Sequence, residues 1–164
     1  MVTGAEETTM RATRSSWVAL LAGLGLAAGA WLALPQPRPA LAHKEPHTAE
    51  QMKLFQDLFM EQVSIGDLLF HGDAATEARL GVKLSNTGWA CAMCHPFASD
   101  THPAQFPKWQ EQMSKFATLR DMINWCIEKP NEGEAIDPDG PAMKALEAYI
   151  TWSNRNSPLQ PGVH

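Results

Sequence analysis

The sequence predicts an all-α domain. Three stretches place apolar residues at helical spacing, within residues 48–70, 118–129 and 141–153. No segment of useful length alternates apolar and polar residues, as a strand with one buried face would. The chain has 164 residues, which is enough for one domain, and it shows no internal repeat. We therefore expect a single helical domain.

The N-terminal stretch has the pattern of a secretory signal. Two arginines precede an apolar run over residues 17–34, and an A-x-A cleavage motif ends at Ala42. We predict a signal peptide over residues 1–42 and a mature domain over residues 43–164, which would be periplasmic or otherwise exported. The alternative is an uncleaved segment that associates with the membrane, because the apolar run is near the lower length limit for a membrane span.

The first helix of the mature domain is expected to begin after Thr48, which has the spacing of a capping box with Gln51. Gly66 predicts a break or a kink, residues 71–73 predict the end of the helix, and residues 74–80 predict a further helical turn or two. We expect the apolar stripe of this helix to pack in the core. It consists of Met52, Phe55, Leu58, Phe59 and Val63.

Cys91, Cys94 and His95 form C-x-x-C-H, the attachment signature of a c-type haem. Two thiols at this spacing can form thioethers with the two vinyl groups of one porphyrin, and the adjacent His95 can ligate the iron. A zinc site would need a second ligand pair, and none stands out. A thioredoxin-like dithiol would need a βαβ context, which is missing. We therefore predict one covalently attached haem c, enclosed by a cytochrome-c-like domain.

The segment after this motif, residues 96–108, contains three prolines and is expected to be a loop. Such a loop can pack across an edge of the haem. Its aromatic side chains, together with the tryptophan that follows, are candidates for the wall of the haem site. They are Phe97, Phe106 and Trp109.

The two C-terminal helices have clear boundary signals. Thr118 is expected to cap the first of them, with Asp121 at the third helical position, and Pro130 ends it. Pro141 suits the first turn of the last helix. The expected core-facing residues are Leu119, Met122, Ile123, Cys126 and Ile127 in the first helix, and Met143, Leu146 and Ile150 in the second.

Three residues are candidates for a second axial ligand of the iron. Met143 lies C-terminal to the motif, where a distal methionine is often found, but it falls inside the last helix. His102 follows His95 closely, so it would have difficulty reaching the opposite face of the haem. Cys126 lies on a core-facing stripe and is the one cysteine that attachment does not use. The residues by themselves leave this choice open.

The charge balance excludes some classes of partner. The chain has 18 acidic and 13 basic side chains and a formal net charge of −5, which argues against nucleic acid and against an anionic membrane surface. It is compatible with a basic redox partner protein. The cationic side chains near the predicted haem site are expected to be solvated surface charges. They are Lys108, Lys115, Arg120 and Lys129.

The motif ending at His95, followed by Met122-Ile123-Asn124-Trp125-Cys126, resembles the haem domain of thiosulfate dehydrogenases. A more distant similarity is to the cytochrome subunit of the thiosulfate-oxidising multienzyme system. The similarity extends over residues 68–152. It implies that Cys126 is the distal ligand, so that the iron has His/Cys axial ligation, and that the reduction potential is low because an anionic sulfur favours ferric iron.

Two departures from this family bear on function. Thiosulfate dehydrogenases carry two haems, whereas this chain has one C-x-x-C-H, and they tend to place an arginine where Met122 stands. We therefore favour one-electron transfer with a redox partner and assign no catalytic residue. The alternatives are an oxidoreductase acting on thiosulfate or a related sulfur compound, and a haem subunit of a larger redox complex.

Overall fold

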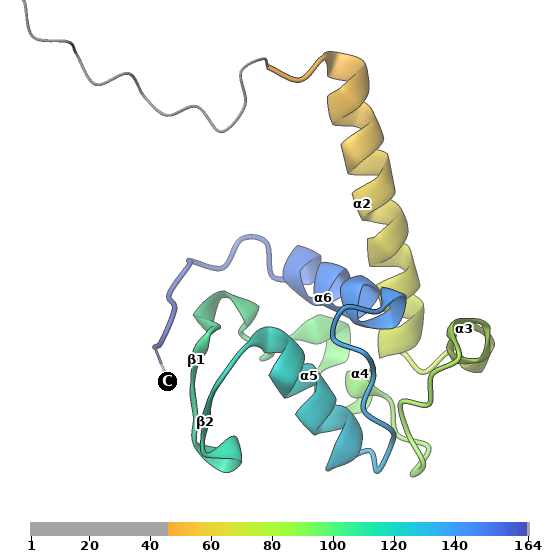
Figure 1. The fold of residues 1–164 in the computed structure, drawn as a ribbon, viewed down its shortest axis with the longest axis vertical. Coiled ribbons are helices and arrows are strands. Elements are labelled where there is room, and N and C mark those ends of the chain that lie inside the picture. The colour runs from red at the N-terminus through yellow and green to blue at the C-terminus, as the bar shows by residue number, and fades with distance from the viewer. Residues whose placement is uncertain (1–45, 164) are drawn as a thin grey trace, which may run out of the picture. The chain divides into compact units, whose positions relative to one another are not determined.

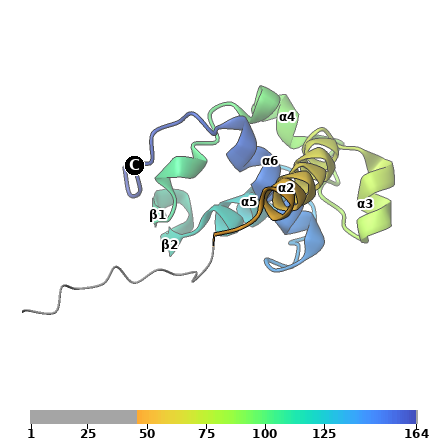
Figure 2. The ribbon, with the colours of Figure 1, turned by 90° about the horizontal axis from the view of Figure 1, so that it is seen from above.

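The computed structural model describes residues 46–163. The predicted signal peptide, its cleavage point and the alternative membrane anchor lie outside these residues. Figures 1 and 2 show how the helices of the domain are arranged. The helices are α2 (Ala49–Phe70), α3 (Ala74–Leu80), α4 (Cys91–Cys94), α5 (Leu119–Glu128) and α6 (Pro141–Ser153). The short elements are the 3₁₀ turns η1 (Pro96–Ala98), η2 (Pro103–Gln105) and η3 (Glu111–Met113) and the strands β1 (Lys108–Gln110) and β2 (Lys115–Ala117).

Helix α2 begins as the sequence predicts. The backbone N–H of Gln51 donates to Thr48 Oγ1 over 3.2 Å, and the backbone N–H of Thr48 donates to Gln51 Oε1 over 2.9 Å. The helix then continues without interruption to Phe70, so the break or kink expected at Gly66 is wrong. A Cβ atom at Gly66 would collide with the carbonyl group of Ala145. This glycine therefore permits close approach of α2 and α6.

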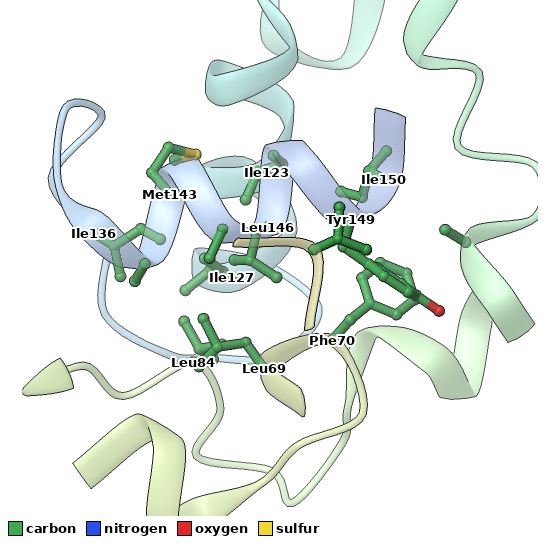
Figure 3. Close-up of a cluster of buried hydrophobic side chains, with 14 residues drawn as sticks. Leu69, Phe70, Leu84, Ile123, Ile127, Ile136, Met143, Leu146, Tyr149 and Ile150 are labelled. Carbon is green, nitrogen blue, oxygen red and sulfur yellow. The ribbon is translucent and has the colours of Figure 1, made fainter. Parts of the chain in front are cut away.

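The core forms where α2, α5 and α6 meet, and α2 and α6 have the most extensive packing of any two elements. Figure 3 shows the side chains from these helices, with Leu84 and Ile136 from the connecting loops. The largest fully buried side chains are Leu69, Phe70, Ile127, Met143 and Leu146. The predicted core face of the last helix is thus confirmed.

The N-terminal half of α2 extends beyond α6 (Figure 1), and its apolar residues are not covered. Met52 is 54% exposed, Phe55 is 46% exposed and Leu58 is 52% exposed, whereas Val63 is buried. Core packing of the whole apolar stripe was expected from its spacing, and for this half of the helix that prediction is wrong. The spacing shows that the helix has an apolar face, but it does not show where the neighbouring helix ends.

The described fold is mostly helical, as predicted, with one small exception. Strands β1 and β2 pair antiparallel, with Lys108 opposite Ala117 and Gln110 opposite Lys115. Each strand has three residues, which is too short for an alternating pattern to be recognised in the sequence. Among the described residues, no helix combines the length and apolar character needed to cross a membrane.

Helices α5 and α6 have the predicted boundaries. Thr118 and Asp121 form a capping box at the start of α5, and the helix ends at Glu128, just before Pro130. Pro141 occupies the first turn of α6. The side chain of Asn124 donates to the carbonyl of Ile136 over 2.8 Å and accepts from its N–H over 3.0 Å. These bonds attach the loop between the two helices to α5.

Candidate haem site

The two cysteines of the motif lie in the single helical turn α4. Backbone hydrogen bonds from His95 N–H to Cys91 O and from Met93 N–H to Ala90 O, each 3.0 Å long, hold this turn. Residues three apart lie on the same side of a helical turn, so the thiols of Cys91 and Cys94 project to a common side. Cys91 is half-buried and Cys94 is exposed. Both are free thiols in this structure.

The ring of His95 is oriented by the backbone. Its Nδ1 atom lies 2.9 Å from the carbonyl oxygen of Ser99. A carbonyl oxygen only accepts hydrogen bonds, so Nδ1 carries the proton in this contact and Nε2 keeps a free lone pair. Histidines that ligate metals commonly have their second ring nitrogen held in this way. The geometry of His95 therefore suits ligation of a metal through Nε2.

A cavity of about 260 Å³ brings the predicted ligands together. Cys91, His95 and Cys126 all line it. Cys94 is not part of the lining, but its thiol is close enough to Cys126 to affect the pKa of that group. The apolar residues around the cavity are Phe70, Phe106, Leu119, Met122, Ile123 and Ile150. The structure thus places residues from the motif and from α5 around one apolar space.

Burial keeps two of these thiols protonated. It raises the pKa of Cys91 to about 12, with the Cys126 thiol as a second cause. Burial also raises the pKa of Cys126 to about 11, with the Cys94 thiol as a second cause. At neutral pH both groups are therefore thiols. A thiolate at Cys126 would need a positive charge close by, which an iron ion supplies.

The other two candidates for the distal ligand differ in position. Met143 is fully buried and lies toward the opposite end of α6 from Ile150 (Figure 3). It is two helical turns from Ile150, the residue of α6 that lines the cavity. His102 does line the cavity, from the residue that precedes η2. Met122, which was not considered as a ligand from the sequence, lines the cavity one turn before Cys126.

One of the three aromatic candidates for the wall of the haem site lines the cavity. Phe106 lines the cavity, whereas Phe97 is 80% exposed and Trp109 is 59% exposed, and neither lines it. The expectation for Phe97 and Trp109 is therefore wrong. Trp109 points away because it lies between Lys108 and Gln110 on β1, and alternate residues of a strand face opposite sides.

The cationic side chains near the site also divide into two groups. Lys115 is paired with Asp121 at 2.6 Å, and Arg120 is paired with both Asp139 and Glu147, at 3.0 and 2.9 Å. Both are paired with carboxylates, and neither lines the cavity. Lys108 is different, because it is only 9% exposed and lines the cavity. The prediction that Lys108 is a solvated surface charge is therefore wrong.

The donor set fits an iron porphyrin. Within residues 46–163, no cluster of three or more His, Cys, Asp or Glu side chains is arranged to hold a metal ion. The imidazole of His95 and the thiol of Cys126, which line the same cavity, suit an iron whose remaining ligands come from a porphyrin ring. The neighbouring Cys91 and Cys94 supply the two thiols that attachment of such a ring requires.

Comparison with known proteins shows which family the domain resembles. Residues 82–159 match the family described as SoxA/TsdA, cytochrome c domain. This segment is similar to cytochrome c domains of the SoxA/TsdA type. Such a domain implies haem c as its cofactor, and it confirms the cytochrome-c-like fold predicted from the helical pattern and the C-x-x-C-H motif.

Two curated relatives are thiosulfate dehydrogenases. The protein from Allochromatium vinosum is 24% identical over 134 residues, which is 73% of this chain and 49% of the relative. The protein from Psychrobacter arcticus is 25% identical over 77 residues, which is 42% of this chain and 24% of the relative. The predicted resemblance to the haem domain of thiosulfate dehydrogenases is therefore confirmed. This chain spans half or less of the length of these relatives.

A solved structure of thiosulfate dehydrogenase (TsdBA) from Marichromatium purpuratum is also similar. The sequences are 21% identical, and the similarity covers 82% of this chain and 28% of the other. The TM-score is 0.46.

Proposed function

We propose that this protein is a c-type cytochrome that transfers single electrons through one haem, attached to Cys91 and Cys94 and ligated by His95 and Cys126. One observation carries the proposal. Cys91 and His95 from the motif and Cys126 from α5 line the same apolar cavity, although Cys126 is far from the motif in the sequence. A domain of the SoxA/TsdA cytochrome c type provides the context in which this arrangement has a function.

The haem, when bound, supplies a one-electron couple between ferric and ferrous iron. The residues of the chain determine the reduction potential of this couple. Ser99 holds the Nδ1 proton of His95, which leaves Nε2 for the iron and increases its basicity. A Cys126 thiolate adds a negative charge next to the iron and favours the ferric state. We therefore expect a reduction potential below that of a cytochrome with His/Met ligation.

The partner and the compartment are part of the same proposal. The predicted leader over residues 1–42 supports export to the periplasm, the side of the membrane on which c-type haem is attached. The chain is acidic, with a net charge of −5, which suits a basic redox protein and disfavours nucleic acid. Apolar side chains around the motif are exposed and available for a transient contact. They are Trp89, Met93 and Phe97.

The test is a redox titration of the protein purified from a host that attaches haem c. We expect one haem per chain, retained after denaturation, and a reversible one-electron change in the visible spectrum. Low-temperature electron paramagnetic resonance of the ferric form should show a low-spin signal of the thiolate type. A purified protein that folds but contains no covalent haem would overturn the proposal.

A second candidate is an oxidoreductase acting on thiosulfate or a related sulfur compound, since both curated relatives are named thiosulfate dehydrogenases. Reduction of the haem by thiosulfate, with turnover in the presence of an artificial electron acceptor, would favour it. A third candidate is a haem subunit of a larger redox complex, since the exposed apolar side chains Trp89, Met93 and Phe97 are available to contact a second redox protein. Co-purification with a second haem protein from the native host would support that reading.

A further inference from the structure

Lys108 is a buried cation beside the candidate haem site. It lies on β1, is 9% exposed and lines the cavity. Its Nζ atom donates to Gln105 Oε1 over 3.2 Å and lies 5.0 Å from the centre of the Phe106 ring. In the part of the chain that the structure describes, Lys108 forms no ion pair with a carboxylate.

An ammonium group that is withdrawn from water needs an anion to compensate for lost hydration. One amide oxygen and one aromatic face compensate for part of this loss. Lys115 and Arg120, which are less buried, each have carboxylate partners, whereas the more buried Lys108 has none among the described residues. Asp100 also lines the cavity but forms no ion pair with Lys108. We therefore expect the missing negative charge to come from a group that enters the cavity.

Gln110 lies next to Lys108 on the same face of β1. It is 9% exposed, it lines the cavity, and its side chain forms no hydrogen bond within residues 46–163. No described side chain has a fully buried polar atom without a partner, so the Gln110 amide retains access to open space. The pairing of Lys108 with Ala117 and of Gln110 with Lys115 fixes both residues in register.

The surroundings of Lys108 are also held in place. The N–H of Gly162 donates to the carbonyl oxygen of Gln105 over 2.9 Å, and the N–H of Gln160 donates to Ala104 over 3.0 Å. The C-terminal segment thereby fixes the residue that contacts the Lys108 ammonium.

We propose that Lys108 and Gln110 together bind a propionate carboxylate of the haem. The inference rests on the proposed function, since it requires the haem to be present. A haem has two propionates, and these are its anionic groups apart from the iron ligands. An ammonium and an amide N–H at one edge of the cavity can both donate to one carboxylate, and hydrogen bonds between charged groups are the stronger kind.

The test is the reduction potential measured as a function of pH, from about pH 4 to about pH 9. Four proteins are compared: wild type, Lys108→Met, Lys108→Arg and Lys129→Met. A cation beside a carboxylate lowers its pKa by about 1–3 units. Loss of this cation should therefore raise the pKa of the propionate. The pH range over which the reduction potential changes should then shift to higher pH by about one unit or more. Lys108→Arg and Lys129→Met should keep the wild-type profile, because Arg retains the charge and Lys129 is exposed.

Other ionisable groups face the same cavity, namely Cys91, His95, Asp100, His102 and Cys126. All of them are present in the four proteins, so differences between the profiles report the charge at position 108. At neutral pH, the Lys108→Met protein should also have a lower potential than wild type, since an uncompensated propionate favours ferric iron.

The haem content is measured first, on a denaturing gel. Absence of covalent haem from the wild-type protein would overturn the proposed function itself. Covalent haem in all four proteins, with the same pH profile for Lys108→Met and Lys129→Met, would overturn the role of Lys108 and leave the proposed function intact. If Lys108→Met does not accumulate, Gln110→Glu is measured. A carboxylate at position 110 should shift the profile in the same direction, and an unchanged profile would overturn the inference.

Discussion

The side chain of Asn154, at the end of α6, donates from Nδ2 to the carbonyl oxygen of Ala98 over 3.0 Å. Ala98 is fully buried and has a positive φ of 56°. It is three residues after His95 and next to Ser99, the residue that holds the His95 ring. The last helix of the domain thus fixes the backbone that orients the predicted proximal ligand.

Substitution of Asn154 by Leu should destabilise this connection. Ala98 O would keep its bond from Thr101 Oγ1, at 2.7 Å, but would lose the one from Asn154. We expect the free energy of unfolding to fall by about 1–3 kcal/mol, as measured by urea denaturation. The matched control is Asn156→Leu, an exposed position, which should change the stability by less than about 0.5 kcal/mol. Equal effects at the two positions would show that the Asn154 bond is not important.

Covalent attachment should depend on the two cysteines of α4 and on no other. The double variant Cys91→Ala/Cys94→Ala should give no haem-stained band on a denaturing gel, because both thioethers are lost. Cys126→Ala is the matched control, and its band should remain, since an axial ligand is not needed to keep a covalently bound haem. A band in the double variant would contradict the attachment site.

The distal ligand is tested by exchanging sulfur ligands. Cys126→Met should retain haem and raise the reduction potential substantially, because a neutral thioether replaces an anionic thiolate. Met143→Leu and Met122→Leu should leave the low-spin spectrum of the ferric protein nearly unchanged, since each replaces one apolar side chain by another of similar volume. Loss of the low-spin spectrum in either methionine variant, with no change in the Cys126 variant, would instead assign the ligand to that methionine.

The capping box of α5 should make the stability depend on pH. A hydrogen bond from Lys115, followed by one from the Thr118 N–H, lowers the pKa of Asp121 from 3.8 to about 2. A carboxylate with a lowered pKa in the folded state adds stability above its unfolded pKa. This contribution is lost as the pH falls from about 4 to about 2.

We therefore expect Asp121→Asn to reduce the free energy of unfolding at pH 7 by about 1 kcal/mol, a value reduced for screening by solvent. The difference from wild type should disappear near pH 2. Urea denaturation at several pH values measures it. Glu128→Gln, an exposed position on the same helix, serves as the control and should show no such trend. A loss of stability that persists at the lowest pH would mean that the cap, and not the charge, is responsible.

The parts of this domain that could be predicted from sequence are those with a local physical cause. The caps at Thr48 and Thr118 and the first turn at Pro141 act through hydrogen bonds and backbone angles within one helical turn. The C-x-x-C-H motif needs only its own spacing. The helical stripe of α5 was sufficient to place Cys126 on the side that faces the cavity.

The predictions that the structure contradicts concern features that depend on segments distant in the sequence. A glycine within a helical pattern has the same local signal whether it breaks the helix or, like Gly66, admits a neighbouring backbone. The burial of Lys108 follows from the pairing of two three-residue strands, which leaves no periodic signal. The same pairing directs Trp109 away from the cavity. The signal in the sequence for the orientation of these side chains is the alternation of Lys108, Trp109 and Gln110. Three residues are too few to identify a strand by this pattern alone.

The uncovered start of α2 has a consequence for the cooperativity of the domain. The segment from Ala49 to Leu58 is held by local contacts, which include its own backbone bonds, the Thr48 cap and the edge contact between the rings of His47 and Phe55. Isolated helices shorter than about 12–15 residues are only marginally stable. From Val63 onward the same helix is part of the core. The two halves of this continuous helix are therefore expected to unfold separately. We therefore expect its first turns to open and close locally, so that their amide protons exchange with water readily, and the amide protons of its last turns to exchange only when the whole domain unfolds.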